Sequence, residues 1–250
     1  MRAALIAHKS DCDPGLVGVA LRERGYSFIE YMREDSGQWR DQIDEILAQC
    51  DLVVSLGSGW STYWPGVSEH VAAEAELLRR AHHHGVRVLG ICFGAQVLST
   101  AVGGTVDKSS EPEIGWYPVR PQTPAIVGDL DSSAVTSTGA SESKELQSES
   151  LSGPWLQWHY DRFSVPDGWK MYADSPAGPQ IIHSGRSVGV QFHPEATESI
   201  VARWSEGTGL DELAAVGVDP SDLFERTCRE VPEAAQRCNR FIEWFFDITQ

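Results

Sequence analysis

The chain has 250 residues, of which 41% are apolar and 22% are charged, which is the ordinary range for a globular protein. Its 20 Lys and Arg residues stand against 36 Asp and Glu residues and give a formal net charge of −16. This excess argues against nucleic acid or an anionic membrane as the main partner, because both require a cationic surface. A small polar substrate or a protein partner fits better.

Cysteine usage and apolar runs bound the class of protein further. The five cysteines are scattered without C-x-x-C pairs, and the apolar part of the N-terminal MRAALIAHKSDC is too short for a signal peptide. No segment approaches the length of a membrane-spanning helix. We therefore expect a reduced, cytoplasmic protein without membrane association. No linker is evident, which predicts one domain over residues 1–250.

Strand and helix patterns alternate through the first hundred residues. The expected strands are residues 4–8, 26–31, 52–57 and 86–91, and the expected helices are residues 14–24, 68–85 and 93–102. Asp13 and Ser68 are candidate N-caps, and Gly25 and Gly85 are candidate helix stops. Short apolar strands separated by helices indicate βαβ units. The predicted fold class is therefore α/β, with a mostly parallel central sheet flanked by helices.

The pattern changes after Gly103 to short strands and turns, at residues 114–119, 180–185 and 187–193. This predicts a smaller region of antiparallel strands. A helical tail is expected from about Ala196, ending at residues 234–248, where apolar residues recur every three or four positions. Residues 129–153 are rich in Ser, Gly and Glu and are either a solvated surface loop or a lid or partner-docking segment.

A cysteine lies between two glycines in GICFGAQ, residues 90–96. G-x-C-x-G is the cysteine counterpart of the strained strand–turn–helix elbow that exposes a nucleophilic serine above an α/β sheet. A side chain at Gly90 or Gly94 would crowd the neighbouring backbone. The helix N-terminus favours the thiolate, and the amide of Phe93 can stabilise an oxyanion. Cys92 is therefore a candidate nucleophile, although a lone cysteine in an apolar stretch is more often a core residue.

The stretch GVQFHPE, residues 189–195, supplies the remaining groups for nucleophilic catalysis. Pro194 favours an extended backbone at His193, and a turn after the strand can bring the Glu195 carboxylate onto the imidazole. A cysteine nucleophile needs a base, and the base needs an acceptor that orients it. Cys92, His193 and Glu195 together fill these three roles. His-Pro-Glu alone would more simply be a strand end followed by a surface carboxylate.

Together these segments resemble the class I (triad) glutamine amidotransferases, whose domains carry G-x-C-x-G-x-Q and H-P-E in this order. The stretches EIGW (113–116) and WHYD (158–161) and the helical tail resemble members related to the glutaminase domain of GMP synthase, so the resemblance runs through nearly the whole chain. It implies a flavodoxin-like sheet. It also implies that Cys92 is the nucleophile, His193 the base and Glu195 its orienting acceptor.

The resemblance further implies an oxyanion hole and a substrate pocket. The family's oxyanion loop normally reads Gly-Gly-Pro, whereas this chain has LGSGWS, so Ser58 and Gly59 would join the amide of Phe93. Without the proline the loop is expected to rotate more freely, which predicts weak activity in isolation and stimulation by a partner that orders residues 57–60. The residues expected to line the substrate pocket are Gly57, Gln96, Gly115, Trp116 and His159. His159 has core packing as its alternative.

The reaction implied is hydrolysis of the glutamine side-chain amide through a thioester on Cys92, with no metal or organic cofactor. AHHHG, residues 81–85, predicts capping of a helix C-terminus rather than a metal site, because adjacent histidines on a helix point in different directions.

The sequence contains neither a G-x-x-x-x-G-K-[ST] phosphate loop nor an S-G-G-x-D-S pyrophosphatase loop. A separate synthetase, or another ammonia-accepting enzyme, is therefore the expected partner. Two alternatives stay open. One is a hydrolase or transferase of other γ-glutamyl compounds, and the other is a catalytically idle module that binds a partner.

Overall fold

The computed structural model describes residues 1–122 and 151–250, so the expectations for the Ser- and Glu-rich stretch 129–153 lie outside the described residues up to residue 150. The strands are β1 (Arg2–Ala7), β2 (Ser27–Met32), β3 (Leu52–Ser55), β4 (Arg87–Ile91), β5 (Val106–Tyr117), β6 (Arg120–Pro121), β7 (Trp155–Phe163), β8 (Lys170–Ser175), β9 (Gly178–Ser184) and β10 (Ser187–Val190). The α-helices are α1 (Gly15–Glu23), α2 (Ser36–Trp39), α3 (Ile43–Gln49), α4 (Ser68–His83), α5 (Phe93–Ala101), α7 (Glu198–Trp204), α8 (Thr208–Ala215) and α9 (Pro220–Ile248). Short 3₁₀ turns are η1 (Arg33–Asp35), η2 (Arg40–Gln42) and η3 (Pro65–Val67).

The main sheet has the strand order β2-β1-β3-β4-β10-β9-β8-β6, and β5 and β7 form a separate antiparallel pair. Pairing is parallel from β2 through β10 and antiparallel from β10 through β6. The predicted α/β fold with a mostly parallel sheet and a smaller antiparallel pair is confirmed. The structure also refines the prediction, because most strands after Gly103 extend the main sheet and β10 itself runs parallel to β4.

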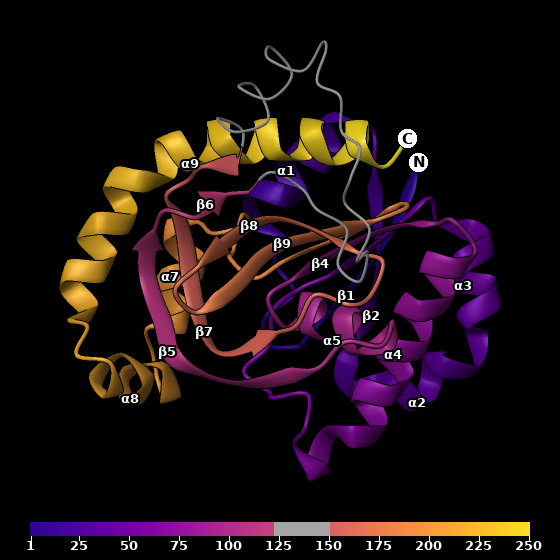
Figure 1. Ribbon diagram of the computed structural model, residues 1–250, viewed down its shortest axis with the longest axis horizontal. Coiled ribbons are helices and arrows are strands. Elements are labelled where there is room, and N and C mark those ends of the chain that lie inside the picture. Colours follow the sequence, from indigo (N-terminus) through magenta and orange to yellow (C-terminus); the bar gives the residue numbers. More distant parts are fainter. Residues whose placement is uncertain (123–150) are drawn as a thin grey trace, which may run out of the picture.

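Helices cover both faces of the main sheet (Figure 1). Alternate residues of β1 face opposite sides, so Leu5 packs in the core beneath α1 and α9 while Ile6 packs beneath α3, α4 and α5. A strand buried on both faces needs apolar side chains at successive positions, which the sequence ALIA supplies. A third cluster packs α7, α8 and the first half of α9 against β5 and β7.

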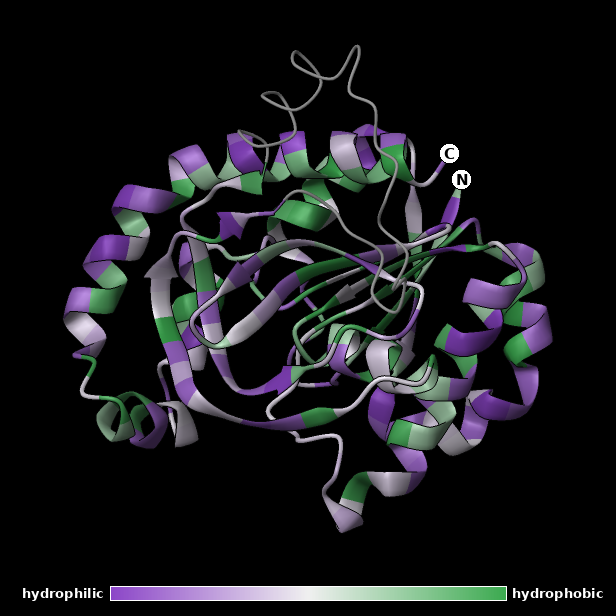
Figure 2. Ribbon diagram, viewed as in Figure 1, coloured by the Kyte–Doolittle hydropathy of each residue, from purple (hydrophilic) through white to green (hydrophobic). Residues whose placement is uncertain are grey.

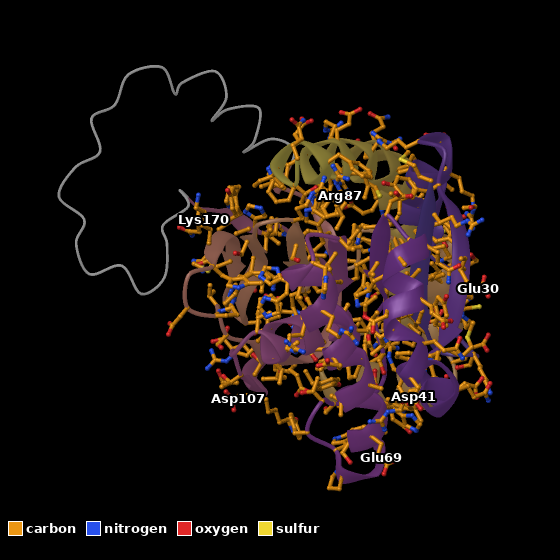
Figure 3. All side chains as sticks on the ribbon, turned by 90° about the vertical axis from the view of Figure 1, so that its right-hand side faces the viewer. Glu30, Asp41, Glu69, Arg87, Asp107 and Lys170 are labelled. Carbon is orange, nitrogen blue, oxygen red and sulfur yellow. The ribbon has the colours of Figure 1, made fainter. Side chains whose placement is uncertain are left out.

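The C-terminal helix α9 lies across one face of the sheet (Figure 1). Its polar residues face outward, and its buried face includes Phe241 and Phe245 (Figure 2). Asp219 caps its start by accepting from the amides of Ser221 and Asp222, which ends the connection from α8. At the other end Arg87, labelled in Figure 3, stacks on Phe246 and bonds to Thr249. None of the described helices is both long and apolar enough to cross a membrane.

Two helix starts differ from the sequence-based expectation. Helix α1 begins at Gly15 after Pro14, and the Asp13 carboxylate accepts from the Gly15 amide at 2.9 Å, so Asp13 acts one position before the cap. Ser68 is the first residue of α4 rather than its N-cap, and its hydroxyl donates back to the carbonyl of Pro65 at 3.0 Å. The preceding 3₁₀ turn η3 runs directly into α4, so the first turn needs no side-chain cap.

Candidate active site

Cys92 lies between the end of β4 and the start of α5. Its φ of +50° is the single positive φ of a non-glycine residue within the described ranges. An L-residue in such a conformation stores on the order of 1–3 kcal/mol of backbone strain, so the surrounding structure must impose it. The Cys92 amide donates to the Val190 carbonyl at 2.7 Å, which ties this turn to the end of β10.

The glycines around Cys92 permit this turn. A Cβ on Gly90 would lie 2.7 Å from the carbonyl oxygen of Gly94, and a Cβ on Gly94 would lie 2.2 Å from that of Ser55. Helix α5 can therefore start directly against β3 and β4, which leaves its first amides near the Cys92 side chain. The elbow expected from G-x-C-x-G is present in the structure.

His193 reaches the same place from the neighbouring strand. Because β10 runs parallel to β4, the carboxyl ends of both strands meet at one edge of the sheet. The strand predicted over 187–193 ends at Val190, and the amide of His193 instead donates to the Leu156 carbonyl at 2.8 Å. The His193 Nδ1 lies 2.7 Å from Glu195 Oε1, and both residues are buried. Cys92, His193 and Glu195 thus converge.

Charge and burial act on His193 in opposite directions. Burial disfavours the imidazolium, but the Glu195 carboxylate and the Cys92 sulfur outweigh it and hold the pKa of His193 well above its usual value. Its Nε2 is buried and makes no hydrogen bond within the described residues. Only Nδ1 is engaged by Glu195, so Nε2 is the nitrogen left to exchange a proton with a reacting group.

The Cys92 sulfur has two further polar neighbours. Gln191 donates from Nε2 to the sulfur at 3.5 Å, and the thiol lies 3.9 Å from the Trp158 carbonyl oxygen. The Gln96 amide donates to Gln191 Oε1 and to the Asp161 carbonyl, both at 3.4 Å. The side chain of Gln96 therefore supports the Cys92 neighbourhood from α5.

The loop after β3 passes over the Cys92–His193 pair. A Cβ on Gly57 would lie 2.9 Å from His193 Cε1 and 3.7 Å from the Cys92 Cβ, so only glycine fits there. The next residue, Ser58, lies 2.6 Å through its hydroxyl oxygen from Nε2 of His8, and the same oxygen accepts from the Trp60 amide at 2.9 Å.

A buried arginine holds the start of this loop. Arg33 donates to the carbonyls of Leu56 at 3.1 Å and Gly57 at 3.2 Å, and it pairs with Glu74 at 2.6 Å and 3.0 Å. Arg33 and Glu74 are both fully buried, and the Ser55 hydroxyl adds a 2.5 Å hydrogen bond to Glu74. Side chains therefore anchor the start of the loop that lacks a proline, and the expectation that residues 57–60 rotate freely stays a prediction.

A cleft of about 560 Å³ opens at these residues. Among the residues singled out by sequence, its lining includes Gly57, Ser58, Gly59, Cys92, Gln96, His159 and His193. His159 is 4% exposed, and its Nδ1 and Nε2 lie 3.1 Å from the Asp161 carbonyl and the Gln157 side chain, so it combines core packing with a place at the cleft wall.

Gly115 and Trp116 were expected to line the substrate pocket, but they are not part of the cleft lining. Both are buried in β5, and the Trp116 indole donates to the Thr227 hydroxyl of α9 at 2.9 Å. Glu195 and Phe93 are also absent from the residues that line the cleft. Within residues 1–122 and 151–250 there is no group of three or more His, Cys, Asp or Glu side chains that could hold a metal ion.

Several residues of the site carry no recognisable sequence motif. His8 directly follows β1, Arg33 lies in the turn after β2, and Trp204 ends α7, and no motif separates them from packing or surface residues. Gln191 could have been suspected, because it lies two residues before His193 and strand alternation would place both side chains on the same face of the sheet. Only the folded chain brings these four residues to Cys92 and the loop after β3.

Comparison with known proteins agrees with this architecture. The family Glutamine amidotransferase class-I matches residues 38–201 of the chain. The chain is 31% identical to a glutamine-hydrolysing GMP synthase of Aeropyrum pernix over 202 residues, and 35% identical to that of Pectobacterium carotovorum over 120 residues. These alignments cover 78% and 46% of this chain, but only 35% and 21% of the two synthases.

Solved structures share the fold along the whole chain. A glutamine amidotransferase of Thermotoga maritima has a TM-score of 0.75 at 24% identity, covering 98% of this chain and 97% of that one. A glutamine amidotransferase of Methylobacillus flagellatus has a TM-score of 0.72 at 20% identity, covering 100% and 95%. The fold is that of the glutamine amidotransferases, and the chain belongs to the class I family.

Proposed function

We propose that this protein is a cysteine-dependent glutaminase, in which Cys92 is the nucleophile, His193 the acid and base, and Glu195 the group that orients His193. The observation that carries the proposal is the convergence of three groups at one edge of the sheet. The strained Cys92 turn, the buried His193–Glu195 pair and the glycine-bearing loop after β3 meet around a cleft. Nucleophile, base and orienting carboxylate are the parts that acyl transfer from an amide requires.

The first half of the reaction follows from these positions. The Cys92 thiolate attacks the side-chain carbonyl carbon of glutamine, and the negative charge moves to the carbonyl oxygen. In this mechanism the backbone amides of Phe93 and of Ser58 or Gly59 donate to that oxygen. When the tetrahedral intermediate collapses, the C–N bond breaks and His193 Nε2 gives its proton to the departing ammonia. A raised His193 pKa keeps that proton available at neutral pH.

The second half releases glutamate. Water enters the position that ammonia has left, and neutral His193 takes one of its protons as it attacks the thioester. The C–S bond then breaks, the Cys92 thiolate is restored, and His193 again carries its proton. The Glu195 carboxylate stays ionised throughout and stabilises each imidazolium state.

Ammonia delivery is the finer part of the proposal. We propose that the ammonia serves an acceptor activated outside these 250 residues, since the sequence has no ATP-binding loop of either type considered above. The GMP synthases that match the chain are described as glutamine-hydrolysing, which agrees with this role. Stimulation of glutamine turnover by a synthetase would support delivery, and full uncoupled turnover unaffected by any synthetase would contradict it.

Labelling with a glutamine-like diazoketone tests the nucleophile. We expect modification of Cys92, which is buried at the cleft, and not of the more exposed thiols of Cys12 and Cys228. Cys92→Ala should abolish release of ammonia and glutamate while leaving the thermal unfolding curve in place, and Cys228→Ala is the matched control. Labelling that falls mainly on Cys12 or Cys228 would contradict the assignment.

A hydrolase of larger γ-glutamyl amides is the second candidate function, and one observation favours it. The cleft of about 560 Å³ lies within the roughly 300–1,000 Å³ typical of pockets that hold drug-sized ligands, which are larger than glutamine. The same Cys92 chemistry applies to any γ-glutamyl amide, because only the amine that leaves is different.

A further inference from the structure

The space beside His193 Nε2 determines which amines can leave. In the proposed mechanism the amide nitrogen must approach this atom to be protonated, since Nδ1 is held by Glu195. The Trp204 ring centroid lies 4.6 Å from that of His193, edge to face. A substituent on the leaving nitrogen therefore starts next to Trp204.

Trp204 belongs to an aromatic wall. Its ring centroid lies 5.8 Å from that of Trp158, again edge to face, and Trp158 also supplies the carbonyl beside the Cys92 sulfur. Both indoles are half-buried and line the cleft. Their N–H groups are already engaged, because Trp204 donates to Asp11 and Trp158 to Glu212, each at 2.6 Å. The wall therefore offers the cleft ring surfaces rather than hydrogen-bond donors.

A second aromatic group lines the same cleft on the segment that follows the loop after β3. Trp60 packs edge to face on His8 at 4.5 Å, and the exposed side chains of Tyr63 and Trp64 follow it. The Tyr63 hydroxyl donates to Asp161 at 2.9 Å, so this segment is fastened to β7 next to the wall. Large exposed aromatic side chains that gather in one cleft mark a binding surface.

Three carboxylates lie beside the wall, and their hydrogen-bond partners differ in charge. The Asp11 carboxylate is engaged by Arg203 as well as by Trp204, and Glu212 is engaged by Trp158. The Asp161 carboxylate accepts from Ser61 and Tyr63. Hydrogen bonds from neutral N–H and O–H groups do not offset the charge of a carboxylate, so among these three only Asp11 has a cationic partner. Glu206 also lines the cleft. An amide whose amine carries an ammonium group is therefore the competing ligand that the test must include.

We propose that this cleft accepts γ-glutamyl amides whose amine carries a neutral aromatic ring, and that Trp158 and Trp204 bind that ring. The inference rests on the proposed function. In the reaction the γ-glutamyl C–N bond breaks, His193 supplies the proton to the aromatic amine, and water completes glutamate, so no further reactant is needed.

Binding to the inactive Cys92→Ala variant is the first test. Because this variant cannot cleave the amides, their affinities do not depend on how readily each amine leaves. Titration calorimetry compares γ-glutamylbenzylamide with γ-glutamyl(cyclohexylmethyl)amide, which has a similar shape without π-electrons. Because a pair of aromatic rings contributes binding energy beyond that of the apolar area it buries, we expect a dissociation constant about three- to tenfold lower for the benzylamide. The amide of a short diamine serves as the cationic comparison and should bind more weakly than the benzylamide.

Substitutions at the wall test where the ring binds. Trp158→Leu and Trp204→Leu should each bring the ratio of the two dissociation constants close to one. Tyr117→Leu is the matched control, because Tyr117 is an exposed aromatic residue outside the cleft lining, and it should leave the ratio unchanged. Turnover of the same amides by the unmodified protein should rank them in the same order.

The outcomes separate this inference from the proposed function. If glutamine is hydrolysed through Cys92 but the benzylamide binds no better than the cyclohexylmethyl amide, the inference is wrong and the proposed function stands. Tighter binding of the diamine amide would also overturn it. If Cys92→Ala leaves amide hydrolysis intact, the proposed function fails, and with it the reaction of these amides.

Discussion

The hydroxyl oxygen of Ser58 lies 2.6 Å from Nε2 of His8, and Nδ1 of that histidine lies 2.9 Å from the Glu34 carboxylate. Burial, with help from the nearby Arg33 guanidinium, lowers the pKa of His8 despite Glu34. The ring is therefore neutral at pH 7. Its Nδ1–H donates to Glu34, which leaves Nε2 to accept from the Ser58 hydroxyl. This chain of contacts fixes the loop that carries the proposed oxyanion donors.

His8→Ala should lower kcat for glutamine without a matching rise in KM, because the loop loses an anchor that matters most for the transition state. Complete loss of one oxyanion donor costs about 100- to 1000-fold, so the expected decrease lies between about tenfold and that limit. Steady-state kinetics measure it, with Ser58→Ala expected to behave alike. The exposed His83→Ala is the control, and a kcat for His8→Ala equal to that of the control would refute this role.

The pH dependence of turnover should follow His193. Because the Glu195 and Cys92 charges raise its pKa, its proton is present at neutral pH and is lost as pH rises through the raised value. Glu195→Gln removes one of these charges, so the alkaline limb of kcat/KM should move to lower pH. A pH–rate profile of both proteins measures the shift. An unmoved alkaline limb would show that another group controls it.

His193→Ala should reduce turnover about 10²- to 10⁴-fold, the usual contribution of acid–base catalysis. Because Cys92 and His193 act as one unit, the double variant should be no more impaired than Cys92→Ala alone. Glu195→Gln should cost less, since the amide still accepts a hydrogen bond. Near-normal activity of His193→Ala would transfer the role of base to another histidine, with His159 as the first to test.

Gly15 tests how α1 supports Glu195. Gly15 has a φ of +45°, and a Cβ there would lie 1.9 Å from the Glu195 carbonyl oxygen. Gly15→Ala should therefore lower both the free energy of unfolding and kcat/KM. Gly25→Ala is a matched control, because Gly25 has a φ of +82° with no atom within 4 Å of an added Cβ. The control should cost only about 1–3 kcal/mol of backbone strain and leave kcat/KM unchanged. Equal kcat/KM for both variants would contradict the coupling to Glu195.

The buried pair of Arg33 and Glu74 allows stability and function to be separated. Arg33→Met should destabilise the protein by about 3–5 kcal/mol, because it leaves the Glu74 charge buried without its partner. Adding Glu74→Leu should recover most of that stability, since no unpaired charge remains. It should not recover kcat, because the Leu56 and Gly57 carbonyls still lack their donor. Denaturant unfolding and steady-state kinetics on the same samples measure the two effects. If Glu74→Leu recovers both the free energy of unfolding and kcat, the proposed role of Arg33 in holding the loop is wrong.

Restoring the family's Gly-Gly-Pro sequence at residues 57–59 tests whether rotation of the oxyanion loop limits turnover. If rotation of the loop limits turnover, Ser58→Gly/Gly59→Pro should raise glutamine hydrolysis by the isolated protein. The contacts of Arg33 and His8 lead us to expect the opposite, because the double variant removes the Ser58 hydroxyl that His8 holds. Turnover measured with and without a synthetase distinguishes the two. A large gain in the isolated double variant would restore the hypothesis of partner gating.

The sequence by itself determined the parallel strands β1 to β4 of the sheet and the two ends of the proposed catalytic centre. Periodicity located β1 to β4 and the helices α1, α4 and α5 but not α2 and α3, and the glycines at 90 and 94 required the Cys92 turn, because these features depend on near neighbours in the chain. His193 and Glu195 followed for the same reason, since they lie only two positions apart. The one-domain expectation for residues 1–250 stays a prediction.

Tertiary structure decided the rest. His8 meets Ser58 across 50 positions of sequence, and Arg33 meets Glu74 across 41, so no local pattern reports either contact. Trp116 was expected at the substrate but turns to Thr227, 111 positions away, because the partner for its indole N–H lies on α9. Which polar groups a buried side chain finds depends on how distant elements pack, and that choice is made only when the whole sheet is assembled.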